Sequence, residues 1–126
     1  MSKILVIDDE KATLSMFRLF LNALGYEVLL AENGASGIDI FLEEKPRIVL
    51  TDIKMPGMDG FAVLERIKEI DGETEVIMLT GHGDTDLARR AMNMSATGFI
   101  HKPVDKSMLE DVLKRAEGRL SGSDNG

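Results

Sequence analysis

The chain has 126 residues, of which 22 are acidic and 15 are basic, so its formal net charge at pH 7 is −7. This length suits one domain with its own core, because a chain of this size buries roughly 65 to 70% of its unfolded surface. The acidic balance argues against binding to nucleic acid or to an anionic membrane surface, since both need clustered Lys and Arg side chains.

The chain contains no cysteine. Disulfides, thiolate metal sites and cysteine nucleophiles are therefore excluded, and nothing requires an oxidising compartment. The apolar runs are far shorter than the ~20 residues that span a bilayer. The first three residues lead directly into an apolar run, without the segments of a signal peptide. We therefore predict a cytoplasmic protein.

Short apolar runs alternate with longer segments in which apolar residues recur every three or four positions, which is typical of strands alternating with helices. Strands are predicted over residues 3–7, 27–31, 47–51, 75–79 and 97–100. All but the last are rich in Val, Ile or Leu, as expected of parallel strands buried on both faces. The pattern predicts five strand–helix units, a parallel sheet flanked by helices.

Turn residues set some boundaries. The first helix is predicted to end at Gly25 in the left-handed conformation, and the second before Pro46. Residues 121–126 contain no apolar side chain and are predicted to form a flexible tail or linker. The folded domain is predicted over residues 3–120.

Polar residues follow the odd-numbered and fourth strands. Asp8 and Asp9 come after the first strand, Asp52 after the third, Thr80 after the fourth and Lys102 after the fifth. The carboxyl ends of parallel strands share one edge of a sheet, so these side chains should converge there. Clustered carboxylates repel unless a cation neutralises them, and all-oxygen ligands favour Mg²⁺, which usually accompanies phosphoryl groups.

A carboxylate can attack phosphorus and form an acyl phosphate when a cation and fixed donors neutralise the transferred oxygens. Asp52, Lys102 and Thr80, with Mg²⁺, provide such a set. The sequence therefore predicts phosphoryl chemistry at this edge.

Four motifs occur in order along the chain: Asp8-Asp9-Glu10, Asp52 followed by Met55-Pro56-Gly57-Met58-Asp59-Gly60, Thr80-Gly81, and Lys102-Pro103. With them, residues 3 to about 120 resemble the receiver domain of response regulators in two-component signalling. The resemblance implies a doubly wound, flavodoxin-like three-layer α/β sandwich with a five-stranded parallel sheet in the order 2-1-3-4-5. It also implies a cis peptide bond between Lys102 and Pro103.

The resemblance implies that Asp52 accepts a phosphoryl group from a phosphohistidine on a sensor histidine kinase or a histidine phosphotransfer protein. Mg²⁺, or Mn²⁺, would be held by Asp9, Asp52 and the backbone carbonyl of Lys54, with Asp8 orienting a water molecule at the ion. The domain would catalyse its own phosphorylation and slow dephosphorylation and would not be a dedicated enzyme.

The resemblance further implies a two-state switch. Lys102 would pair with a phosphoryl oxygen, the Thr80 hydroxyl would move to another, and Phe99 would swing inward. Phe99 stands where many relatives have Tyr, which removes a hydroxyl from the switch. The signal would leave through the fourth helix, fifth strand and fifth helix, toward an output partner or a phosphorylation-dependent homodimer, which the sequence does not identify.

Three further positions carry predictions. Lys54 and His82 flank the expected path of a hydrolytic water and are predicted to tune dephosphorylation. His101 is predicted to be a solvated side chain beside the site. Ser95 replaces a glycine that receivers commonly carry after the fourth helix, so that helix end is predicted to be shaped differently.

Rival functions remain open at this point. A haloacid-dehalogenase-like phosphatase also uses an aspartate nucleophile, but it needs a second Asp at the position of Lys54. A nucleotide- or flavin-binding module would need a glycine-rich anion cradle after the first strand. Asp8, Asp9 and Glu10 could instead merely cap the first helix and favour its positive end. A purely structural interaction domain would need no convergent carboxylates and would lose nothing on Asp52→Asn.

Overall fold

The computed structural model describes residues 2–81 and 84–125, with side chains described as far as residue 121. Strands and helices alternate along the chain. In order, they are β1 Lys3–Ile7, α1 Lys11–Ala23, β2 Glu27–Ala31, α2 Gly34–Glu44, β3 Ile48–Asp52, α3 Gly60–Ile70, β4 Glu75–Thr80, α4 Thr85–Asn93, β5 Gly98–His101 and α5 Lys106–Asn125.

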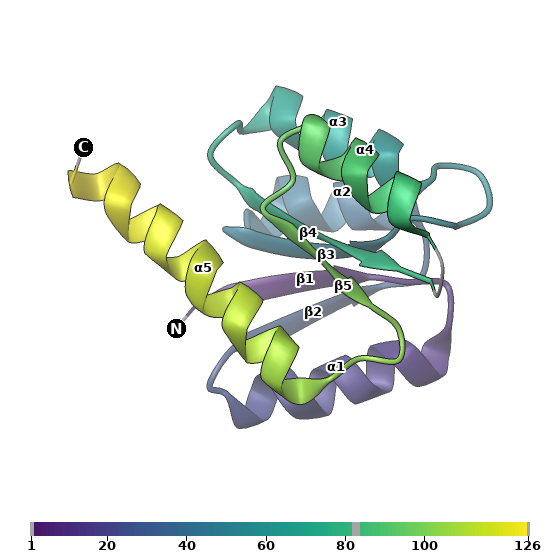
Figure 1. Ribbon diagram of the computed structural model, residues 1–126, viewed down its shortest axis with the longest axis horizontal. Helices are drawn as coiled ribbons and strands as arrows, with labels where there is room; N and C mark the ends of the chain where they lie inside the picture. Colours follow the sequence, from purple (N-terminus) through teal and green to yellow (C-terminus); the bar gives the residue numbers. More distant parts are fainter. Residues whose placement is uncertain (1, 82–83, 126) are drawn as a thin grey trace.

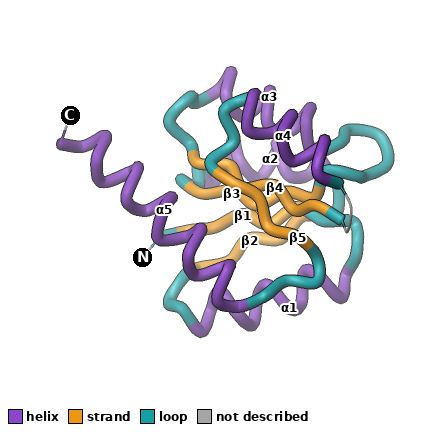
Figure 2. The backbone as a smooth tube through the Cα atoms, viewed as in Figure 1, coloured by secondary structure: helices purple, strands orange, loops and turns teal. Residues whose placement is uncertain are grey.

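The strands form one sheet in the order β2-β1-β3-β4-β5, and every neighbouring pair is parallel (Figure 1). Helices α1 and α5 cover one face, and α2, α3 and α4 cover the other (Figure 2). The predicted doubly wound, three-layer α/β fold with strand order 2-1-3-4-5 is therefore confirmed.

The sheet divides the core into two apolar clusters. Successive side chains of a strand point to opposite faces, so Val49 packs with Phe41 and Leu64 of the α2 and α3 side, whereas Leu50 packs with Phe17 of α1 and with α5. Every residue of β3 and β4 is buried. This packing on both faces fixes the position of the central strand ends.

Three strands end one residue later than the hydrophobic pattern predicts, at Asp52, Thr80 and His101. The reason is that backbone pairing continues into polar residues: Thr80 is the register partner of His101, and the Lys102 N–H donates to the Thr80 carbonyl at 2.8 Å. Thr80 and His101 are therefore held by the sheet itself.

The end of α1 has the predicted left-handed glycine. Gly25 has φ +95°, its N–H donates to the Asn22 carbonyl at 3.0 Å, and the Tyr26 N–H donates to the Leu21 carbonyl at 3.0 Å. These two bonds satisfy carbonyls that the helix leaves unpaired.

The end of α4 adopts the same geometry with serine. Ser95 has φ +71°, its N–H donates to the Met92 carbonyl, and the Ala96 N–H donates to the Ala91 carbonyl, both at 3.1 Å. The prediction of a differently shaped end is wrong, because these bonds and the burial of Ala96 hold serine in the left-handed region.

Ser95→Gly should raise the free energy of unfolding by about 1 kcal/mol, because it removes a left-handed side chain. The matched reverse change is Gly25→Ser, where an added Cβ meets no atom of the described residues within 4 Å, so its cost is conformational. It should lower the free energy by about 1 kcal/mol. Urea unfolding measures both, and a loss of stability in Ser95→Gly would contradict the argument.

Helix α5 continues through residues 121–125 and extends past the sheet (Figure 1). The sequence predicts a flexible tail or linker over residues 121–126, and the segment contains no proline that would end the helix. The domain boundary at residue 120 and the flexibility of the tail stay predictions. Among the described helices, none is long and apolar enough to cross a bilayer.

Candidate functional site

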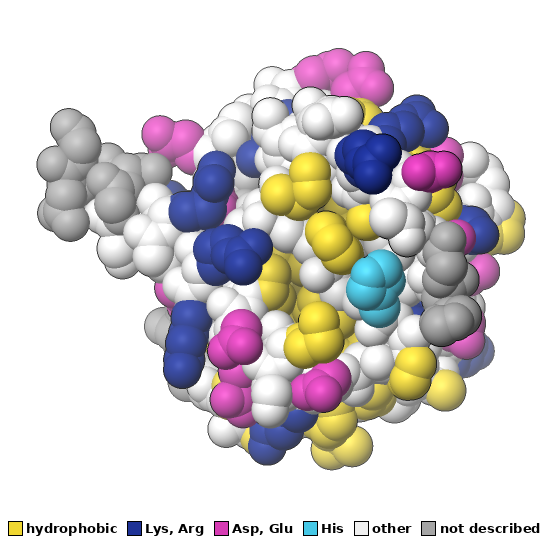
Figure 3. Space-filling model, in the orientation of Figure 1, with side chains coloured by type: hydrophobic (Ala, Val, Ile, Leu, Met, Phe, Trp, Pro, Cys, Tyr) yellow, Lys and Arg dark blue, Asp and Glu magenta, His cyan; other side chains and the backbone are white. Residues whose placement is uncertain are grey.

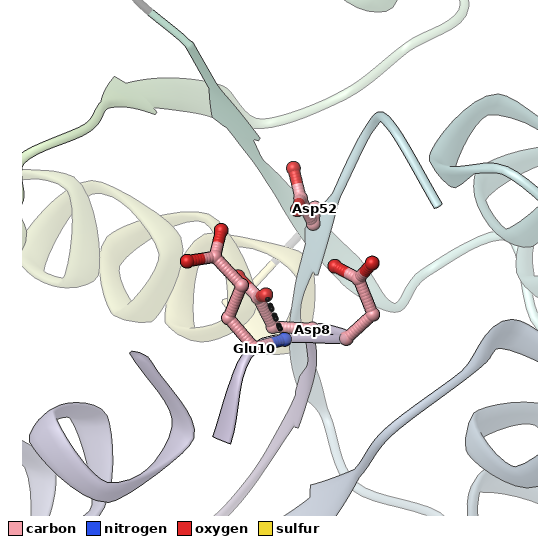
Figure 4. A group of neighbouring side chains, drawn as sticks. Asp8, Glu10 and Asp52 are labelled. Carbon is pink, nitrogen blue, oxygen red and sulfur yellow. Dashed lines mark hydrogen bonds between the residues drawn. The ribbon is translucent and has the colours of Figure 1, made fainter. Parts of the chain in front are cut away.

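Carboxylates gather at the carboxyl ends of β1 and β3. Asp8 is completely buried, Asp52 is 7% exposed, and Asp9 and Glu10 are exposed. One carboxylate oxygen from each of the four lies within 4.8 Å of the others. Figure 4 shows Asp8 and Glu10 beyond β1 and Asp52 on β3, around the same space. Adjacent strands place these groups together, as the strand ends predict.

Lys102 provides a positive charge among these carboxylates. Its Nζ lies 2.8 Å from Asp8 Oδ2, 3.1 Å from Asp52 Oδ2 and 3.5 Å from Glu10 Oε1. Lys102 follows β5, and its peptide bond to Pro103 is cis. The chain therefore brings an ammonium group from the edge strand to the centre of the acidic cluster.

Burial and the contacts between Lys102 and the carboxylates act in opposite directions on the pKa values of Asp52 and Lys102. Burial raises the pKa of the Asp52 carboxyl, the hydrogen bond from Lys102 opposes this shift, and the charges of Asp8 and Asp9 add to it. Burial alone would lower the pKa of Lys102, but its bonds to Asp8 and Asp52 raise that pKa. Lys102 is thus held in its charged form, and Asp52 is a carboxylate that a further cation would stabilise.

The Asp8–Glu10 triplet does not act as a side-chain cap of α1. Glu10 is the N-terminal cap residue, and its side chain makes no capping hydrogen bond within the described residues. Asp8 Oδ1 instead accepts the Glu10 N–H at 2.9 Å (Figure 4). The capping alternative is therefore wrong, and all three carboxylates belong to the acidic cluster.

The loop between β3 and α3 packs closely against the end of β3, which carries Asp52. Asp59 caps α3 by accepting the Ala62 N–H at 2.9 Å, and the Gly60 N–H donates to the Ile53 carbonyl at 2.8 Å. Gly60 packs so closely on the strand that an added Cβ would lie 2.6 Å from Ile53 Cα and would also overlap the Asp52 carbonyl. The absence of a side chain at Gly60 thus sets the position of Asp52.

A hollow of about 310 Å³ opens over Asp52 and Lys102. At its mouth, Lys54 Nζ lies 3.2 Å from Asp84 Oδ1, and Asp84 Oδ2 accepts the Gly81 N–H at 3.0 Å. The sequence prediction missed Asp84, although its position three residues after Gly81 at the start of a helix is typical of a turn-forming aspartate. His82 lies outside the described residues.

Thr80 points away from the acidic cluster. Its hydroxyl is fully buried and lies 2.7 Å from Nδ1 of His101. The His101 ring meets the edge of the Phe99 ring, with centroids 5.3 Å apart and planes at 70°. His101 is exposed, as predicted, but it is not simply solvated. The pairing depends on strand register, which the sequence does not specify.

Comparison with known proteins identifies the family. Residues 4–114 match the family model described as response regulator receiver domain. The chain is 35% identical over 113 residues to sporulation initiation phosphotransferase F of Bacillus subtilis (strain 168), covering 90% of this chain and 91% of that protein. It is 34% identical to the transcriptional regulatory protein GlrR of Escherichia coli (strain K12), covering 90% of this chain but 26% of that protein.

Solved structures agree with this match. A response regulator receiver domain protein from Clostridium thermocellum has a TM-score of 0.92 and 40% identity, covering 96% of this chain and 98% of that one. NtrX from Brucella abortus, in a complex with ATP, has a TM-score of 0.92 and 32% identity, covering 98% of this chain and 28% of that one. The chain thus spans about a quarter of the longer regulators.

Receiver domains act in two-component signalling, in which phosphorylation carries the signal and an acidic pocket binds Mg²⁺. The acidic cluster beyond β1 and β3 is such a pocket in its residue types. With the fold, the ordered motifs and a family match over most of its length, this chain belongs to the response regulator receiver domain family.

Proposed function

We propose that Asp52 accepts a phosphoryl group from a phosphohistidine on a sensor histidine kinase or a histidine phosphotransfer protein in the cytoplasm. The observation that carries this proposal is the contact between Lys102 and Asp52, 3.1 Å long, at the floor of the open hollow. The name of the Bacillus subtilis relative, a phosphotransferase, supports it.

The transfer is a displacement at phosphorus. An oxygen of the Asp52 carboxylate forms a bond to phosphorus while the bond between phosphorus and the imidazole nitrogen of the donor breaks. The electron pair of that bond goes to the imidazole nitrogen, and the ring, protonated at its other nitrogen, leaves as a neutral histidine side chain. The product is an acyl phosphate on Asp52, and Lys102 is placed to neutralise one of its oxygens.

The donor set fits Mg²⁺ or Mn²⁺. Asp8, Asp9 and Asp52 provide carboxylate oxygens within 4.8 Å of one another. Asp9, Asp52 and the backbone carbonyl of Lys54 are the proposed direct ligands, and Asp8 would orient a water molecule at the ion. Both ions prefer such oxygen ligands. When bound, the ion supplies neutralisation of charge on the transferred phosphoryl oxygens.

We propose that the signal leaves through α4, β5 and α5. Hydrophobic side chains gather over β5 between these helices (Figure 3). Each of the three elements contributes an exposed large one: Met92 from α4, Phe99 from β5 and Met108 from α5. Thr80 and Phe99 are the proposed switch residues, because the buried Thr80 hydroxyl and the exposed Phe99 ring both contact His101. The output partner can be another domain or a second copy.

Intact-mass spectrometry after incubation with acetyl phosphate and Mg²⁺ tests the phosphoacceptor. The parent should gain one phosphoryl group, and Asp52→Asn should gain none. Asp39→Asn, which removes an exposed carboxylate on α2, is the matched control and should gain the same mass as the parent. No gain in the parent, or an equal gain in Asp52→Asn, would exclude the proposed reaction.

The same assay, followed in time after removal of the donor, tests the proposed tuning residues. Lys54 is ion-paired with Asp84 at the mouth of the hollow, so Lys54→Ala should open the approach of water to Asp52. Lys54→Ala and His82→Ala are expected to change the decay of the phosphoryl group, and decay equal to that of the parent would remove both residues from this role.

A further inference from the structure

We propose that His101 holds the Thr80 hydroxyl on the β5 side of β4, so that the switch must break the Thr80–His101 hydrogen bond before Thr80 can contact a phosphoryl group on Asp52. His101 is in this view a positioning residue that acts through Thr80. The inference rests on the proposed phosphorylation of Asp52.

The contact follows from strand register. Thr80 and His101 are register partners in the parallel pair β4 and β5, and neighbouring strands lie about 4.8 Å apart. Their side chains therefore leave the same face of the sheet side by side. The Thr80 hydroxyl is fully buried and its 2.7 Å contact with Nδ1 of His101 satisfies it there.

The order of the strands makes the two positions of Thr80 exclusive. Strand β4 lies between β3, which carries Asp52, and β5, which carries His101. A threonine hydroxyl has one proton and occupies one rotamer at a time. When it turns toward a phosphoryl group on Asp52, it leaves His101. The hydrogen bond thus stabilises the state in which Thr80 faces away from the reacting group.

His101 also links Thr80 to the proposed switch ring. Phe99 and His101 are two residues apart on β5, so their side chains share a face, and their rings meet edge to face with centroids 5.3 Å apart. Phe99 is 37% exposed in this arrangement. Loss of the Thr80 contact removes one anchor of the ring against which Phe99 rests. In this chain His101 supplies a polar connection that Phe99, without a hydroxyl, lacks.

The rate of phosphorylation by acetyl phosphate with Mg²⁺, measured by intact mass, tests the proposal. His101→Val keeps a strand-forming residue but removes the hydrogen bond. One net hydrogen bond changes a population roughly fivefold, so His101→Val should react about fivefold faster, because more molecules have Thr80 free to face Asp52. His101→Asn, whose amide can replace Nδ1, should react at nearly the parental rate.

The same substitution made in the Thr80→Val variant separates this role of His101 from a general structural effect. Thr80→Val has no hydroxyl to hold, so adding His101→Val to it should change nothing. A spectroscopic signal gives an independent readout. The chain has two histidines, and the ring nitrogen signal of His101, identified by its loss in His101→Val, should shift when Asp52 is phosphorylated.

Each outcome decides the question. Faster reaction of His101→Val, with His101→Asn near the parent and no effect in Thr80→Val, supports the proposal. Reaction of His101→Val at or below the parental rate overturns it, as does equal acceleration in the Thr80→Val background. If no variant gains a phosphoryl group, the proposed function itself fails, and that result is distinct from phosphorylation that does not depend on His101.

Discussion

Replacing Lys102 with methionine should lower the free energy of unfolding of the Mg²⁺-free protein by about 3 kcal/mol, because breaking a buried ion pair leaves an uncompensated charge. The carboxylates that lose their partner are shielded from solvent, because the Asp8 side chain is fully buried and the Asp52 side chain is 10% exposed. Both lie within 3.1 Å of Lys102 Nζ. Methionine keeps the apolar stem and removes only the ammonium group. The loss of free energy of unfolding therefore measures the contribution of the ammonium charge.

Mg²⁺ should restore much of this stability. An ion that binds the folded state alone stabilises it by about 2.7 kcal/mol at a concentration 100 times its Kd. The gain should be larger in Lys102→Met than in the parent, since the variant has no ammonium group competing for the carboxylates. Lys106→Met, which removes an exposed charge at the start of α5, should change stability by less than about 0.5 kcal/mol.

The pH dependence follows from the raised pKa of Asp52. For a carboxyl whose folded pKa is raised, the stability from protonation is present below its unfolded value of 3.8 and is lost as pH rises through the folded pKa. The parent should therefore lose stability relative to Asp52→Asn over this range, and the Mg²⁺ effect should appear over the same range. Urea unfolding with and without Mg²⁺ measures both. An equal stability difference at every pH would contradict the assignment.

The second large effect is expected at Gly60. Gly60→Ala should lower the free energy of unfolding by about 3 kcal/mol, since overpacking costs most where the neighbour cannot move. The added Cβ would lie 2.6 Å from Ile53 Cα and would overlap the Asp52 carbonyl, which are backbone atoms of a central strand end. The variant should also be phosphorylated more slowly, because Asp52 must shift.

The control for this change is Gly118→Ala. Gly118 lies in α5, and a Cβ there meets no described atom within 4 Å. Alanine should raise the stability by about 0.5 to 1 kcal/mol, as it does in a helix interior. Urea unfolding and the acetyl phosphate assay report both variants. A Gly60→Ala protein with parental stability and rate would show that the loop behind Asp52 can yield.

The parts of the fold that depend on apolar patterning could be predicted from the sequence. The runs that end near Asp8 and Asp52 are buried on both faces, so their residue types specify the strands and the edge where their polar successors meet. Strand ends are less predictable, because the ladder continues through Thr80 and His101, which lie beyond the apolar run that marks each strand.

The conformation of Ser95 and the ion pairs at the site could not be predicted from the sequence, for different reasons. The left-handed Ser95 is stable only because two helix-end hydrogen bonds and a buried neighbour offset its intrinsic cost. The Lys54–Asp84 pair joins two loops whose approach is set by the whole sheet. The contact of Lys102 with Asp8 could not be predicted from the sequence either. The motifs indicate that the two side chains converge at one edge of the sheet, but they do not indicate which carboxylate oxygen Lys102 contacts.

The position of Lys102 among the carboxylates has a consequence for folding. A domain that carries its own counter-ion compensates part of the charge of its carboxylates while it folds, before any divalent ion binds. A divalent ion that binds later adds positive charge to a cluster that Lys102 already neutralises in part.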